Sequence, residues 1–218
     1  MAGRKECNLT KEEVKKAKDE GIFKFTNKVL YDLVKDNPTH DEKKEEEVVT
    51  AKIWIIGRTH AAPIERGETS GMCRDTLCRL FAEKSRKAEI DRYISTIRNS
   101  SKSIDENKDL ILETETKLVK ILQNLTRLQK RSLASKYLHY HLPEFIFIYD
   151  QRARSGLSKI SPHYVTKRER SGKFDNELEN FFLKMLDLQE CIRKEFGMLL
   201  KPREIDRLLL NKSRGSSK

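Results

Sequence analysis

Asp150 stands between an apolar run and two arginines, in the order Tyr149-Asp150-Gln-Arg152-Ala-Arg154. An Asp directly before strong helix formers suits a helix N-cap, with its carboxylate bonded to the free N–H groups of the first turn. The positive end of the helix would keep that carboxylate ionised. A fixed, ionised carboxylate can activate a water molecule or stabilise a developing positive charge. Asp150 is therefore the candidate catalytic residue, and a helix cap without chemistry is the alternative.

Positive charge gathers just after Asp150. Residues 151–174 hold seven lysines and arginines and one acid, a net charge of +6, in a chain whose net charge is +11 and whose pI is ≈ 9.4. Such a balance is the electrostatic footprint expected for a nucleic-acid partner. A solvated basic surface with no polyanionic partner is the alternative, and the clustering favours nucleic acid.

A short helix and a buried connector are expected to position Asp150. Leu133, Tyr137 and His141 recur at helical spacing, and Pro143 ends the helix because its ring cannot continue it. Residues 145–149 then form an unbroken apolar run, which is typical of a buried extended segment. These elements would deliver a carboxylate to the start of the next helix.

Helical periodicity extends over most of the chain, and no useful length alternates with period two, so the sequence predicts an all-α fold. A capping box at Thr10–Glu13 begins a helix of about ten residues that ends near Gly21. A second helix, ending before a proline, should bury one face, made of Ile22, Phe25, Val29 and Leu33.

Asp41 can cap a third helix, which becomes apolar all round at residues 53–56, meets Gly57 and is expected to be buried at that end. A loop over residues 58–71 should follow, and loops held on rigid scaffolds often carry function. The remaining helices are expected over residues 72–97, 111–128, 132–142, 174–198 and from Pro202 onward.

Residues 1–211 are expected to form one helical unit, with room for a cleft near residue 130, and residues 212–218 a frayed basic tail. The apolar runs are too short to span a bilayer, and the first residues lack the apolar core of a signal peptide, which predicts a cytoplasmic protein. The scattered cysteines contain no C-x-x-C pair, which argues against a metal and predicts reduced core thiols at Cys7, Cys73, Cys78 and Cys191.

Residues 132–154 resemble the helix-hairpin-helix DNA glycosylase superfamily. Ser132–Leu138 corresponds to the second helix of the family's hairpin, residues 147–149 to its connector, and Asp150 to its catalytic Asp, 18 positions after Ser132. The resemblance implies a helix-hairpin-helix glycosylase-like helical fold with a central cleft. It also implies a monomer that binds double-stranded DNA without a cofactor.

Two departures from the family concern the hairpin. The family's Leu-Pro-Gly-x-Gly turn is replaced by Thr-Arg-Leu-Gln-Lys at residues 126–130, where side-chain charge would have to replace backbone contacts to phosphate. Ser132 occupies the position of the Schiff-base lysine of bifunctional members. The resemblance therefore implies base excision without lyase activity, and Lys136, one helical turn further on, is the fallback amine.

The implied enzyme is a monofunctional N-glycosylase that flips out a modified base and hydrolyses its glycosidic bond, which leaves an abasic site. Asp150 would stabilise the oxocarbenium-like transition state. Four side chains could line a base pocket, each with a core role as the alternative: Trp54, His60, Tyr137 and Tyr149. Nine cations could contact the DNA: Arg58, Arg66, Arg127, Lys130, Arg131, Arg152, Arg154, Lys167 and Arg168.

The unusual hairpin fits a divergent member of the family better than a housekeeping enzyme. Some divergent glycosylases act in antiviral defence by removing glucosylated hydroxymethylcytosine from phage DNA, and this substrate is a hypothesis here. The alternative function is a non-catalytic nucleic-acid-binding module on the same scaffold. A helical ribonuclease that pairs Arg with His four to six positions apart ranks lower because the Arg–His spacings differ, and a purely structural interaction protein is a further alternative.

Overall fold

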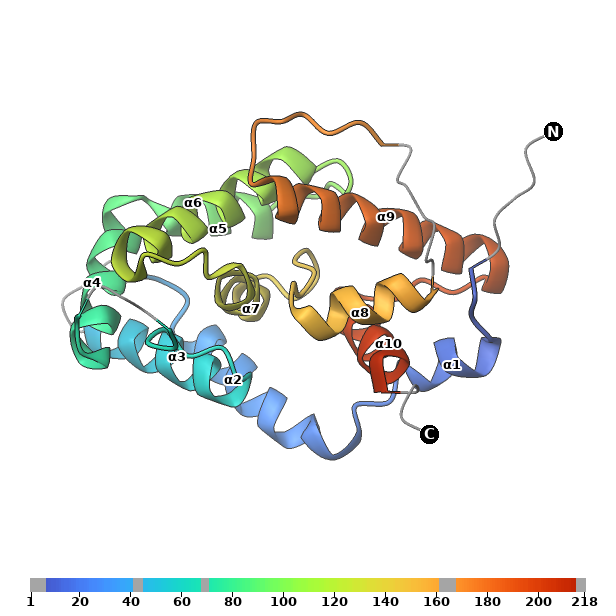
Figure 1. The fold of residues 1–218 in the computed structure, drawn as a ribbon, viewed down its shortest axis with the longest axis horizontal. Helices are drawn as coiled ribbons and strands as arrows, with labels where there is room; N and C mark the ends of the chain where they lie inside the picture. Colours follow the sequence, from blue (N-terminus) through green and yellow to red (C-terminus); the bar gives the residue numbers. More distant parts are fainter. Residues whose placement is uncertain (1–6, 41–44, 68–70, 161–167, 215–218) are drawn as a thin grey trace. The chain divides into compact units, whose positions relative to one another are not determined.

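The computed structural model describes residues 7–40, 45–67, 71–160 and 168–214. Within them every regular element is helical, so the all-α prediction is confirmed. The helices are α1 (Lys11–Lys16), α2 (Lys24–Asp36), α3 (Glu45–Thr59), α4 (Arg74–Lys87), α5 (Ile90–Arg98), α6 (Lys108–Thr126), α7 (Arg131–His141), α8 (Gln151–Ile160), α9 (Asn176–Phe196) and α10 (Pro202–Arg214), with a 3₁₀ turn at Gly21–Phe23 (Figure 1).

The chain forms two compact units, whereas the sequence suggested one with a division near residue 130. Unit 1 comprises Met1–Ile22 and Phe147–Lys218 and contains α1, α8, α9 and α10. Unit 2 comprises Phe23–Ile146 and contains α2 to α7. The boundary at residues 146–147 falls inside the apolar connector that precedes Asp150.

Unit 2 is built around α7, which packs against α2, α3 and α6. A turn at residues 127–130 joins α6 to α7, and Arg127 enters it with a left-handed φ of 62°. No glycine supplies this conformation, although glycine adopts it with least strain. Two helices joined by a short turn therefore stand where the sequence predicted them, and the turn contains no glycine.

The apolar face predicted for α2 is wrong. Phe25 and Val29 are 75% and 48% exposed, whereas Asn27, Leu30 and Val34 are buried. Two stripes at helical spacing were available on this helix, and contact with α3 and α7 selected the one that includes a polar residue.

Four predicted helix boundaries also differ. The capping box at Thr10 forms as expected, but α1 ends at Lys16 instead of near Gly21. α3 continues through Gly57 to Thr59, and the stretch predicted as one helix over residues 72–97 divides at Glu89, whose φ is 54°. Helix α10 extends to Arg214 and so includes the first part of the predicted tail, and residues 215–218 lie outside the described residues.

Gly57 lets the chain that follows α3 fold back closely against the end of the helix. A Cβ at this position would lie 3.1 Å from Pro63 Cα and 3.2 Å from the Ala62 carbonyl oxygen. The chain after the helix thus folds back against a residue that has no side chain, and the Ala62 N–H donates to the Gly57 carbonyl at 2.7 Å. A glycine within a helix usually weakens the helix, and here it also makes room for the returning chain.

Unit 1 is held together by close packing of α8 (orange) against α10 (red), with α1 beside α10 (Figure 1). Gly156 is the point of contact, where an added Cβ would lie 2.1 Å from the backbone oxygen of Leu209. The Lys159 ammonium strengthens this packing by donating to the carbonyl oxygens of Lys212 and Ser213.

The prediction of reduced core thiols is wrong for three of the four cysteines. Cys7 and Cys191 form a disulfide that joins the N-terminal segment to α9, and Cys73 is exposed. Cys78 is buried, and burial raises its pKa to about 11. The disulfide was missed because its cysteines are 184 positions apart, and spacing along the chain carries no information about such a pair.

A buried polar network lies inside unit 2. His40 Nδ1 is 2.5 Å from Asp91 Oδ1, and His40 Nε2 is 2.6 Å from the Tyr137 hydroxyl. His141 stacks on His40 with ring centroids 5.4 Å apart, but neither His141 ring nitrogen has a hydrogen-bond partner among the described residues. Lys52 is fully buried and donates to two backbone carbonyls.

This burial changes the titration of the network. Burial lowers the pKa of His141 well below its usual range, and the charges of Lys52, His40 and Arg98 lower it further. Burial alone would raise the pKa of Asp91, but the hydrogen bond and charge of His40 outweigh it and lower the pKa. The neutral His141 imidazole thus stacks in the core on His40, which pairs with the Asp91 carboxylate.

We expect the stability of the fold to fall as the pH drops below about 6.5, the ordinary pKa of histidine. Below this pH His141 takes up a proton in the unfolded chain but stays neutral in the folded chain. The free energy of unfolding therefore falls by up to about 1.4 kcal/mol per pH unit. His141→Phe should flatten this dependence and raise stability in mild acid. Urea midpoints between about pH 8 and pH 5 measure it.

His139→Phe is the matched control, because His139 is equally buried but bonds to the Tyr31 hydroxyl and the Ile146 carbonyl. Its loss should destabilise the fold at every pH by about 1–3 kcal/mol. Equal pH profiles for wild type and His141→Phe would contradict the assignment to His141.

Candidate functional site

Asp150 caps α8. Its Oδ1 accepts a hydrogen bond from the Ala153 N–H at 2.8 Å, and its side chain is half-buried. The predicted connector leads to it, because Ile146, Phe147 and Ile148 are buried and lack regular secondary structure. The first turn of α8 holds no acid, so Asp150 supplies the negative charge at the positive helix end.

Capping geometry by itself does not distinguish Asp150. Asp175 caps α9 in the same way, with Oδ1 accepting from the N–H groups of Glu177 and Leu178, both at 3.1 Å. The surroundings differ, because acids follow Asp175 in the first turn of α9, whereas arginines follow Asp150.

Three of the predicted cations near Asp150 are placed in unit 1, and two of them have acidic partners. Arg154 lies over the Tyr149 ring and 3.6 Å from Glu177. Arg168 pairs with Asp187 at 3.0 Å and with Glu190 at 3.6 Å. Arg152 is exposed on α8, and Lys167 lies outside the described residues. Arg152 is therefore the cation of this group best placed for an external phosphate.

The predicted residues of unit 2 come together around the start of α7. The Lys136 ammonium, on a side chain that is only 5% exposed, donates to Ser132 Oγ at 3.0 Å and to the His60 carbonyl at 3.2 Å. His60 Nε2 lies 2.5 Å from the Tyr140 hydroxyl. The loop after α3 is thus bonded to α7 through His60, which meets Lys136 and Tyr140.

Basic side chains border the same turn. The Lys130 ammonium donates to the backbone oxygen of Arg66 at 2.5 Å, so it fixes the loop against the turn. Arg127 is exposed at the turn itself, and Arg131 begins α7. The Arg66 guanidinium donates to the Ala61 carbonyl, and Arg58 pairs with Glu65. Arg127 is the exposed cation of this group, and Arg131 lies beside it at the start of α7.

Trp54 lies in a surface pocket of ≈ 590 Å³ between α3 and α4, and its indole is 42% exposed. The prediction that this end of α3 is buried on all sides is therefore wrong. The Arg74 guanidinium lies 5.6 Å from the centroid of the indole ring. The pocket lining contains none of the other residues predicted to hold a base, so those four do not form one pocket.

The other predicted aromatic contacts belong to the core. Tyr137 is fully buried between His40 and Phe81, which leaves no ring face for a flipped base. Tyr149 is 7% exposed, packs on Phe181 and donates its hydroxyl to Glu177. The core role, the alternative for each tyrosine, is the one the structure supports.

Sequence reasoning missed Tyr140, which orients His60 and also donates to Asn27 at 3.4 Å. No local pattern could have identified it, because its partners lie 80 and 113 positions away in the chain. Helical spacing predicts only that Tyr140 faces one side of α7, not which polar groups meet it.

No helix among the described residues is both long and apolar enough to cross a membrane. Comparisons with protein-family models, with curated proteins and with solved structures found no match to this chain.

Proposed function

We propose that the protein is a monofunctional DNA N-glycosylase that hydrolyses the glycosidic bond of a flipped-out base and leaves an abasic site. The observation that carries the proposal is the local arrangement of a helix, a turn, a second helix, a buried connector and an N-capping Asp150. The same order of elements carries the catalytic Asp of the family that residues 132–154 resemble.

Asp150 would act on the sugar. The glycosidic bond breaks through an oxocarbenium-like transition state, and an ionised carboxylate close to C1′ lowers its energy. The hydrogen bond from Ala153 N–H and the α8 dipole favour the charged form of Asp150. The Asp150 carboxylate would also orient the attacking water.

The turn between α6 and α7 would hold the DNA backbone. Lys130, the N-cap residue of α7, makes no side-chain cap hydrogen bond, and its ammonium points to the loop carbonyls. An uncapped helix start with Arg127 and Arg131 beside it suits a phosphate, because backbone N–H groups and guanidinium groups both favour an anion.

The lack of lyase activity in this proposal rests on Ser132 and Lys136. Ser132 has no amine that could form a Schiff base. The Lys136 amine donates to Ser132 Oγ and the His60 carbonyl and is almost inaccessible, so it is poorly placed to attack a sugar carbon. Hydrolysis by water is therefore the proposed route.

The proposed substrate is double-stranded DNA that carries a modified base, with glucosylated hydroxymethylcytosine as the first candidate.

Duplexes with modified and unmodified cytosine are incubated with the protein and then treated with alkali, which cuts at abasic sites. Cleavage of the modified duplex only after alkali is the expected result. Cleavage before alkali would exclude the monofunctional mechanism, and absence of cleavage on every modified base would refute the glycosylase. Binding of DNA without cleavage would favour the non-catalytic module.

Arg127→Ala and Arg131→Ala are expected to weaken duplex binding at every sequence, because each removes one phosphate contact. The slope of log K against log salt should become less steep by about one for each variant. Fluorescence anisotropy over a range of salt concentrations measures both effects. Arg92→Ala, which removes an exposed cation on α5, is the control and should leave the slope unchanged. Equal slopes in all four proteins would place the DNA elsewhere.

A further inference from the structure

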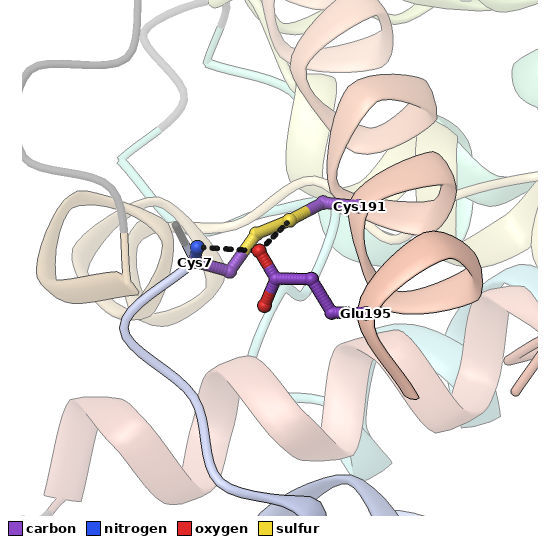
Figure 2. Close-up of side chains that lie close together, drawn as sticks. All are labelled: Cys7, Cys191 and Glu195. Carbon is purple, nitrogen blue, oxygen red and sulfur yellow. Dashed lines mark hydrogen bonds between the residues drawn. A yellow bond between two sulfur atoms is a disulfide. The ribbon is translucent and has the colours of Figure 1, made fainter. Parts of the chain in front are cut away.

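Two cysteines and a carboxylate from distant parts of the chain meet in unit 1 (Figure 2). Cys7 precedes α1, whereas Cys191 and Glu195 lie one turn apart on α9 and so share a face of that helix. One ligand atom from each residue lies within 4.8 Å of the other two. Both cysteines are half-buried and Glu195 is exposed, so the group is reached from solvent on one side.

The position of Glu195 is not explained by the disulfide. Its Oε1 lies 3.3 Å from Cys191 Sγ and accepts a hydrogen bond from the Cys7 N–H at 3.1 Å. A disulfide sulfur carries no proton to donate, so the oxidised pair offers this carboxylate only the backbone N–H. A thiol or a cation shared by the sulfur and the oxygen would make the same contact favourable.

We propose that Cys7, Cys191 and Glu195 form a binding site for a thiophilic divalent cation, with zinc as the best match, when the disulfide is reduced. Two thiolates and one carboxylate are common zinc ligands, and donors around a tetrahedral zinc ion lie roughly 3.5–3.8 Å apart. In the oxidised protein the two sulfurs are bonded to each other, and reduction frees them to separate to that donor spacing while Glu195 stays within 4.8 Å of both. The exposed side leaves space for a water molecule as the fourth ligand.

In this proposal the N-terminal segment is joined to α9 by the disulfide in the oxidised protein and by the bound metal in the reduced protein. Two molecules of a small thiol together donate two electrons and two protons to the Cys7–Cys191 bond, which yields two protein thiols and one small-molecule disulfide. Binding of the cation then releases both thiol protons to water, because the thiolate is the ligand. Exchange with a small-molecule disulfide would restore the Cys7–Cys191 bond, release two small thiols and expel the metal.

Either cross-link anchors the N-terminal segment at the end of α8 opposite Asp150. The Asn8 N–H donates to the carbonyl of Ile160, the last residue of α8, at 3.2 Å, and Asp150 caps the other end of the same helix. Glu13 of α1 pairs with Lys212 of α10 at 2.8 Å. The metal would thus keep α1 against α8 and α10 in reducing conditions, where the disulfide is lost.

Titration of the reduced full-length protein with Co²⁺, in a buffer that contains a phosphine reductant, tests the site. The expected result is one bound ion per chain, with thiolate-to-cobalt absorption and the visible bands of a tetrahedral ion. The oxidised protein should show neither. Zinc should displace the cobalt and raise the thermal midpoint of the reduced protein. Absence of thiolate-to-cobalt absorption in the reduced wild type would overturn the proposal.

Single substitutions identify the ligands. Cys7→Ser and Cys191→Ser should each lose the absorption, and Cys73→Ser should retain it, because Cys73 is an exposed cysteine on another element. Glu195→Gln should bind at least about tenfold more weakly, as even second-shell changes have effects of that size. Glu190→Gln on the same helix should not. Far-ultraviolet circular dichroism confirms that each variant is folded. Absorption that persists in both Cys7→Ser and Cys191→Ser would also refute the site.

Discussion

Asp150→Asn is expected to lower the rate of base excision by about a hundred- to ten-thousandfold, the usual range for a positioned acid–base group. Asn is as good an N-cap as Asp, so the bond to the Ala153 N–H and the start of α8 should remain. The variant therefore removes charge without removing the helix cap. DNA affinity should be unchanged or slightly higher, because a negative charge near phosphate is lost.

Single-turnover kinetics on a duplex with one modified base measure this effect, since they report the chemical step independently of product release. Asp175→Asn is the matched control, because Asp175 caps α9 through the same type of bond but is followed by acids. It should excise bases at the wild-type rate. A similar loss in both variants would mean that Asp150 acts through folding, and full activity of Asp150→Asn would exclude its catalytic role.

Gly156→Ala is expected to destabilise the protein by about 3 kcal/mol or more. An added Cβ would lie 2.1 Å from the carbonyl oxygen, 2.7 Å from the carbonyl carbon and 2.8 Å from the Cα of Leu209. All three are backbone atoms, so no side-chain rotation relieves the overlap and α8 must move from α10. Alanine gains about 1 kcal/mol in helix propensity over glycine, which is too little to compensate.

Thermal unfolding measures this loss, and the midpoint should fall by roughly 6–12 °C for a chain of this size. Ser158→Ala, at an exposed position on the same helix, is the control and should change stability by less than about 0.5 kcal/mol. Leu209→Ala should not rescue Gly156→Ala, because it shortens only the side chain. A rescue, or a stable Gly156→Ala protein, would show that α8 and α10 are less closely packed than described.

The sequence by itself determined the elements that depend on neighbouring residues. The helical class, the capping box at Thr10, the cap at Asp150 and the end of α7 before Pro143 all follow from backbone hydrogen bonds and steric limits within a few residues. The buried connector was also predictable, because an unbroken apolar run has few other places to lie.

The tertiary structure alone decided which helix faces are buried and which charged side chains have hydrogen-bond partners. Helical spacing on α2 allowed two stripes, and packing against α7 chose the one with Asn27. Lys130 and Lys136 could have faced a phosphate or a substrate, but carbonyls more than 60 positions away hold both ammonium groups. The Cys7–Cys191 disulfide likewise depends on folding that brings together two segments 184 positions apart. The physical reason is that local bonding fixes backbone conformation, whereas side-chain partners depend on which distant segments the core brings together.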